Sequence, residues 1–115
     1  MRLATDDRKA SKKLRTQVES ASNVCVSAAS VWEVAIKCAV GRLDGDPKSF
    51  HSAIDAFGFR ELAITGTHTL AVARLPPLHK DPLDRLLIAQ AMTEPLLLLT
   101  TNDTLAAYSD LVRVV

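Results

Sequence analysis

The sequence of 115 residues has few aromatic side chains, only two cysteines, almost no net charge and no long apolar run. Aromatic residues make up 4% of the chain and all hydrophobic residues 48%, so Leu, Val, Ile and Ala must form the core, which disfavours an aromatic-rich β-sandwich.

Cys25 and Cys38 lack the spacing of a zinc or redox motif and are interpreted as free thiols in a reducing compartment. A net charge of +1 leaves any nucleic-acid contact to a local patch. Because the charged N-terminus is no signal peptide and no stretch is long enough to span a membrane, we expect a cytoplasmic protein without membrane contact.

The rest of the chain alternates short apolar runs with capped helical segments. Apolar, often β-branched runs predict strands over residues 23–27, 61–64, 96–100 and 111–115. Capping residues, Asp-Pro pairs and helix-ending glycines predict helices after residues 5–7 and over 27–39, 46–58, 65–75 and 81–94, with a helical turn over 103–108. The helix over 27–39 is apolar nearly all round, so we expect it to be mostly buried. Wholly apolar strands between helices indicate one α/β domain over residues 1–115, with a parallel sheet covered on both faces.

Three acidic residues are expected at one edge of this sheet. Asp103 follows the strand over 96–100, Glu33 lies in the first turns of the helix after the strand over 23–27, and Asp84 lies in the first turn of a helix that crosses the sheet. Ligands of open parallel sheets bind at the carboxyl ends of the strands. Three convergent carboxylates would hold a hard cation such as Mg²⁺ or Mn²⁺, which can activate water for hydrolysis of a phosphodiester.

Each of these residues also has a purely structural interpretation. Glu33 and Lys37 have the spacing of an ordinary helix ion pair. Asp84 can complement the positive end of its helix, and Asp103 can be a plain N-cap. The residues alone leave both interpretations open.

Three segments of the chain resemble motifs of the VapC-type PIN toxins, the toxin components of type II toxin–antitoxin systems. SAASVWEVAIK at 27–37, followed by GRL at 41–43, is similar to the family's second motif. HKDPLDRLLIAQA at 79–91 resembles the third motif, and LLTTND at 98–103 the fourth. The resemblance covers essentially the whole chain and implies a PIN-like three-layer sandwich, with a parallel sheet between helices.

The resemblance also implies an activity, a site and partners. The family consists of Mg²⁺- or Mn²⁺-dependent ribonucleases, so Asp84 and Asp103 would bind the metal ion and Glu33 would hold a metal-bound water or a second ion. Thr101 would orient Asp103 or that water, and Arg85 would contact phosphate or form an outward ion pair. RNA would be the substrate, a VapB-like antitoxin the partner, and a homodimer or segment-exchanged oligomer the assembly.

The N-terminus departs from the family's pattern. Members begin with a central strand that ends in a metal-site Asp, whereas residues 3–7 here, LATDD, match the segment after that strand. The chain is therefore expected to lack the first strand and its carboxylate, with Asp6 and Asp7 capping the next helix instead. Two functions follow as alternatives: an active ribonuclease, or a catalytically impaired PIN scaffold that binds an antitoxin or itself.

Overall fold

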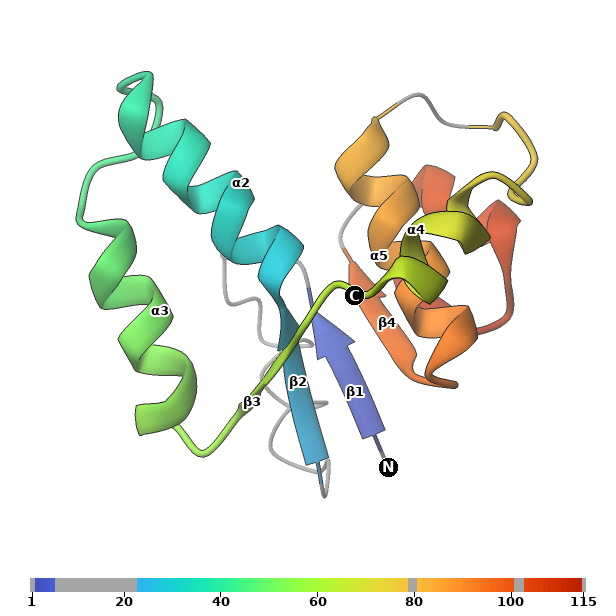
Figure 1. Ribbon diagram of the computed structural model, residues 1–115, viewed down its shortest axis with the longest axis horizontal. Helices are drawn as coiled ribbons and strands as arrows, with labels where there is room; N and C mark the ends of the chain where they lie inside the picture. The colour runs from blue at the N-terminus through green and yellow to red at the C-terminus, as the bar shows by residue number, and fades with distance from the viewer. Residues whose placement is uncertain (1, 6–22, 79–80, 101–102, 115) are drawn as a thin grey trace.

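The computed structural model describes residues 2–5, 23–78, 81–100 and 103–114 (Figure 1). This part of the chain contains a sheet of five strands in the order β3-β2-β1-β4-β5, and all four neighbouring pairs are parallel. The strands are β1 (Arg2–Thr5), β2 (Asn23–Ser27), β3 (Arg60–Leu62), β4 (Leu97–Thr100) and β5 (Val112–Val114). The predicted α/β fold with a parallel sheet is confirmed.

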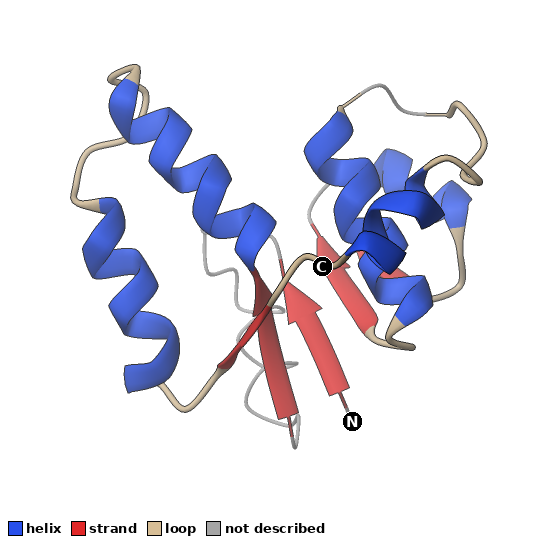
Figure 2. Ribbon diagram, in the orientation of Figure 1, coloured by secondary structure: helices blue, strands red, loops and turns tan. Residues whose placement is uncertain are grey.

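The helices begin at the residues that the sequence indicates. They are α2 (Ala28–Ala39), α3 (Pro47–Ala56), α4 (Gly66–Val72), α5 (Pro82–Thr93) and the short 3₁₀ helix η1 (Asp103–Tyr108) (Figure 2). Asp46 and Asp81 cap α3 and α5 by accepting a backbone N–H two residues on, and a proline follows each of them at the first helical position. The predicted helix after residues 5–7 lies outside the described residues.

The expectation that the central strand is missing is wrong. Arg2–Thr5 forms β1 in the middle of the sheet, where Leu3 pairs with Val24 of β2 on one side and with Leu97 of β4 on the other. A gap between β2 and β4 would leave two rows of backbone N–H and C=O groups without partners. Strand β1, although only four residues long, provides these partners. The sheet therefore contains no opening at its centre.

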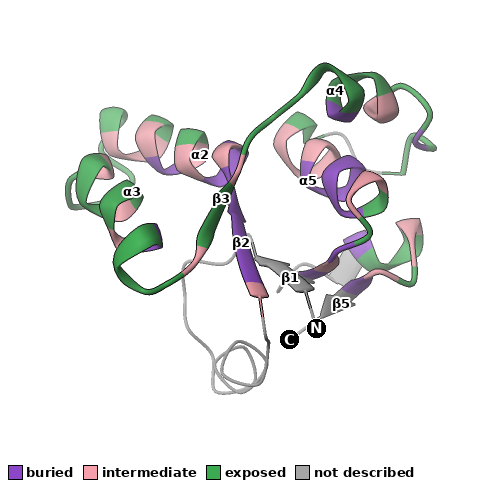
Figure 3. Ribbon diagram, turned by 60° about the horizontal axis from the view of Figure 1, so that its bottom comes forward, coloured by how far each residue is buried: buried purple, intermediate pink, exposed green. Residues whose placement is uncertain are grey.

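The core lies between α5 and the sheet. Residues 87–91 of α5 are all buried, and Leu96 and Leu98 beside them are fully buried (Figure 3). The cluster also contains Leu75 after α4, Leu105 of η1, Ala29 of α2 and Val112 of β5. Branched and unbranched aliphatic side chains thus form the core, as the shortage of aromatic residues requires.

The prediction that the helix over 27–39 is mostly buried is also wrong. Only Ala29, Ser30 and Val34 of α2 are buried. On the opposite side, Trp32 and Ile36 are 56% and 41% exposed, and Val40, at the end of the helix, is 61% exposed. Spacings of four residues place these three side chains in one apolar stripe along α2. The helix is apolar on two sides, but in this chain only one of them packs against the core.

Candidate functional site

A cleft separates α2 from the N-terminal end of α5. It has a volume of about 400 Å³, and its lining includes Glu33 and Lys37 of α2 and Asp81, Leu83 and Asp84 at the start of α5. Helix α2 leaves the carboxyl end of β2, while α5 precedes β4 and runs in the opposite direction to the strands, so both helices begin on the side of the sheet where the strands have their carboxyl ends (Figure 1). This is the edge at which open parallel sheets bind their ligands.

The cleft brings together two of the three predicted carboxylates. Glu33 and Asp84 are 51 positions apart in sequence and belong to two helices, and both line this one cleft. Asp103 begins η1, three residues after the end of β4 at Thr100, but its side chain lies outside the described part of the structure. Thr101 also lies outside the described residues. The described residues therefore place one carboxylate pair, Glu33 and Asp84, at the predicted edge.

The two structural interpretations of these carboxylates are both visible in the geometry. The Lys37 ammonium lies 3.2 Å from Oε1 of Glu33, so the expected helix ion pair is present. Asp84 is in the first turn of α5, whose cap is the neighbouring Asp81. An ion pair and a helix-end charge do not prevent either carboxylate from binding a cation, because both side chains still border the cleft.

The donor set of the cleft is suited to a hard cation. Carboxylate oxygens are the ligands that Mg²⁺ and Mn²⁺ select. Ser30, one turn before Glu33 on α2, has a buried hydroxyl without a hydrogen-bond partner among the described residues, but it does not line the cleft. Within the same part of the chain, no three His, Cys, Asp or Glu side chains lie close enough together to hold a metal ion. The pair Glu33 and Asp84 thus fits a cation as part of a ligand set and does not complete that set.

Arg85 has a structural role that sequence reasoning did not anticipate. Its guanidinium donates to the backbone carbonyls of Val72, Leu75 and Pro76 at distances of 2.9–3.3 Å, and to the Tyr108 hydroxyl at 3.1 Å. These carbonyls end α4 and the turn after it, where backbone acceptors lack helical partners. These hydrogen bonds direct the Arg85 donors at α4 and η1, and the contact with phosphate or an outward ion pair stays a prediction.

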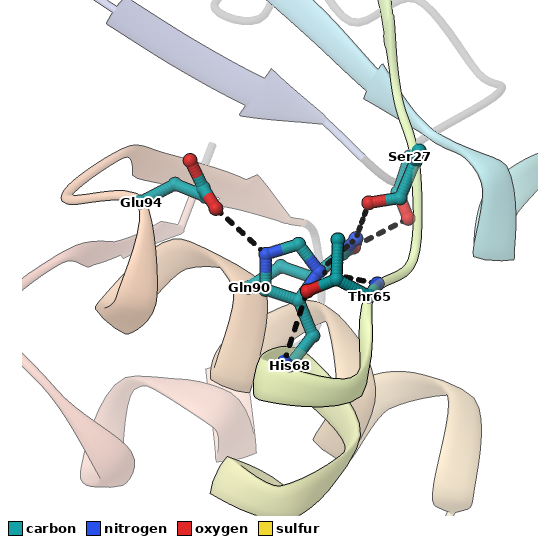
Figure 4. Close-up of polar contacts among 6 residues, drawn as sticks. Ser27, Thr65, His68, Gln90 and Glu94 are labelled. Atoms are coloured by element: carbon teal, nitrogen blue, oxygen red, sulfur yellow. Dashed lines mark hydrogen bonds and ion pairs between the residues drawn. The ribbon is translucent and has the colours of Figure 1, made fainter.

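A buried polar network links the two helices that border the cleft, and the sequence did not predict it. Ser27, His68 and Gln90 are each at most 2% exposed and come from β2, α4 and α5. Their hydrogen bonds connect the start of α2 to α5, the two helices that border the cleft (Figure 4). The three residues are 22 or more positions apart, so no local pattern relates them; only the capping position of Ser27 gave a signal.

The comparison with protein families assigns the fold. The model of the PIN domain matches residues 1–111 of the 115 in the chain. The chain belongs to the PIN domain family. PIN domains are in general nucleases that depend on divalent metal ions. The predicted membership of the family is confirmed, while the VapC subtype stays a prediction.

A solved structure shares the PIN fold of this chain. It is a toxin–antitoxin complex from Klebsiella pneumoniae, with a TM-score of 0.69 and 17% identity over 96% of this chain and 95% of the other. At this identity the similarity concerns the fold. The curated proteins contain no match to the chain. None of the described helices of this PIN domain is long and apolar enough to cross a membrane.

Proposed function

We propose that this PIN domain is the toxin component of a toxin–antitoxin pair, a ribonuclease that hydrolyses RNA phosphodiesters with the help of Mg²⁺ or Mn²⁺. The observation that carries the proposal is the position of Glu33 and Asp84 on two sides of one cleft above the carboxyl ends of the parallel strands. Asp103 is proposed as the third carboxylate and Thr101 as the residue that orients it, from the resemblance of their motif to the VapC-type toxins.

The chain's own residues would bind the ion and orient the substrate. Glu33 and Asp84 would supply carboxylate oxygens from opposite sides of the cleft, and a bound divalent ion supplies a nucleophilic water and neutralises charge on the phosphodiester. Lys37 and Arg42, which also line the cleft, are cations that would attract the RNA backbone. Leu83 and Ile36 form apolar parts of the cleft wall.

The second candidate function is a scaffold that binds a protein partner without efficient catalysis. The apolar stripe formed by Trp32, Ile36 and Val40 favours a protein partner, because exposed apolar side chains in a row are typical of interaction surfaces. The complex with the similar fold contains an antitoxin, and we propose a VapB-like antitoxin as the partner here. Self-association stays a proposal based on the family resemblance alone. Strand β1 already fills the centre of the sheet, so no segment from a second chain is needed there.

One experiment separates the two functions. Purified protein is incubated with single-stranded RNA in Mn²⁺, with the variant Asp84→Asn and the control Asp55→Asn, an exposed acidic residue on α3 outside the cleft. Catalysis at the cleft predicts Mn²⁺-dependent cleavage that falls about a hundredfold in Asp84→Asn and is unchanged in Asp55→Asn. No cleavage by the wild-type protein, together with tight antitoxin binding, would establish the scaffold function.

A further inference from the structure

Gln90 lies at the centre of the buried polar network of Ser27, His68 and Gln90, and Glu94 extends this network toward the surface (Figure 4). Its Oε1 accepts a hydrogen bond from the Ser27 hydroxyl at 2.5 Å. Its Nε2 donates to the carbonyl oxygen of Ala63 at 3.3 Å and faces Nδ1 of His68 at 3.4 Å. Because the Ala63 carbonyl can only accept, the amide nitrogen must be on that side and the amide oxygen must face Ser27.

His68 continues the network from α4 to the end of α5. Its Nδ1 accepts the backbone N–H of Thr65 at 3.1 Å, so the ring carries its proton on Nε2 when neutral. That Nε2 lies 2.8 Å from Oε2 of Glu94, the residue that caps α5. Helix α5 therefore contacts α4 at two places, through Gln90 and through Glu94.

Ser27 connects the network to the cleft. It is the N-cap of α2, and its Oγ accepts the backbone N–H of Ala29 at 3.0 Å while its proton is donated to Gln90. Glu33 is six residues after Ser27 and Gln90 is six residues after Asp84. Six residues correspond to about 9 Å along a helix, so the Ser27–Gln90 bond joins α2 to α5 less than two turns away from each cleft carboxylate.

We propose that Gln90 is a positioning residue for the cleft: it fixes the start of α2 against α5 and thereby sets the separation of Glu33 and Asp84. The inference rests on the proposed function, because it assigns the network a purpose in holding the metal-binding carboxylates. The stability of the core does not require polar side chains at these positions, since apolar residues of similar shape would stabilise it about equally well. A buried network in which each amide and ring atom has a partner instead specifies one arrangement of its helices.

The test compares metal binding in variants that lose the bond with one that loses only packing. Gln90→Met keeps a side chain of similar length without hydrogen bonds, and Ser27→Gly removes the partner hydroxyl at an N-cap that tolerates glycine. Ile54→Val, a buried position of α3 outside the network, is the control for a general loss of stability. Mn²⁺ affinity is measured by calorimetry, and hydrogen exchange of the first turn of α2 is measured without metal.

We expect Gln90→Met and Ser27→Gly each to weaken Mn²⁺ binding about tenfold, the size typical of residues that orient metal ligands, and to speed exchange in the first turn of α2. The double variant should weaken binding no more than the stronger single variant, because each single variant already removes the Ser27–Gln90 bond. Ile54→Val should leave the Mn²⁺ affinity within about twofold of wild type, since its loss is confined to packing.

The possible failures are distinct. Folded Gln90→Met and Ser27→Gly proteins with wild-type Mn²⁺ affinity would overturn the positioning role while leaving the metal site intact. If Gln90→Met does not fold, the milder Ser27→Gly variant decides the question by itself. A wild-type protein that binds no Mn²⁺ would overturn the proposed function and, with it, the positioning role.

Discussion

The ammonium of Lys37 lies 3.2 Å from the carboxylate of Glu33, one turn earlier on α2, and both side chains border the cleft that Asp84 borders from α5. Lys37 is thus the counter-ion of Glu33, one of the carboxylates that we propose to bind the metal ion. An ion pair between partly exposed side chains contributes at most about 1 kcal/mol to stability, so a divalent ion can compete with it.

Lys37→Met is therefore expected to strengthen Mn²⁺ binding while weakening RNA binding. Removing a positive charge next to the site should raise the Mn²⁺ affinity by roughly threefold to tenfold at low salt, and the gain should shrink as salt is added. The RNA affinity should fall because one phosphate contact is lost. Calorimetry with Mn²⁺ and fluorescence anisotropy with RNA measure the two effects, and a lower Mn²⁺ affinity in Lys37→Met would contradict a metal-binding role for Glu33.

Asp84 and Asp81 form a matched pair for testing ligand and cap roles in one cleft. Asp84→Asn should reduce the Mn²⁺ affinity at least tenfold and leave stability without metal level or higher, because repulsion from Glu33 is relieved. Asp81→Asn removes the same charge but keeps an N-cap that can accept the Leu83 N–H, so its effects on stability and on Mn²⁺ affinity should both be small. Equal Mn²⁺ affinities for the two variants would show that only the net charge of the cleft matters.

A structural role for Arg85 predicts a loss of stability, whereas a phosphate-binding role predicts a loss of RNA affinity. Arg85→Lys should lower the free energy of unfolding by about 1–3 kcal/mol, because an ammonium cannot satisfy the carbonyls and the hydroxyl that the planar guanidinium contacts. Its RNA affinity should remain close to wild type while the protein is folded. Urea unfolding and RNA titration measure the two quantities, with the exposed cleft residue Arg42→Lys as the control for stability; unchanged stability with lost RNA binding would restore the phosphate role.

Local signals in the sequence explain most of the fold. Asp46-Pro47 and Asp81-Pro82 marked the starts of α3 and α5, because a capping carboxylate followed by proline has few other stable conformations. The apolar run before Thr100 identified β4 in the same way. These features depend on neighbouring residues alone, which is why they could be predicted without the structure.

Features that depend on distant residues could not be predicted. Strand β1 has four residues, and its position is decided by the unpaired edges of β2 and β4 rather than by its own composition. The exposed side of α2 depends on which neighbours pack against it, so the sequence alone could not decide whether Trp32 is buried or exposed. The pairing of Gln90 with Ser27 spans 63 positions, and a glutamine in an apolar helix pattern carries no sign of its partner.

The central strand provides the last prediction, which tests how the N-terminus is used. Ala4 lies in the middle of β1, paired with Cys25 on one side and Leu98 on the other. Ala4→Pro removes a backbone N–H from the centre of a parallel sheet and restricts φ, so it should lower the free energy of unfolding by about 3 kcal/mol or more. Ala4→Ser keeps the backbone N–H and adds only one oxygen to the side chain, so it is the matched control. Its free energy of unfolding should fall by less than about 1 kcal/mol. Urea unfolding followed by circular dichroism measures both variants.

If residues 3–7 instead followed the first strand, as their resemblance to the family's sequence pattern implies, Ala4 would lie outside the sheet. The two variants would then have equal stability, and β1 would have to be reassigned.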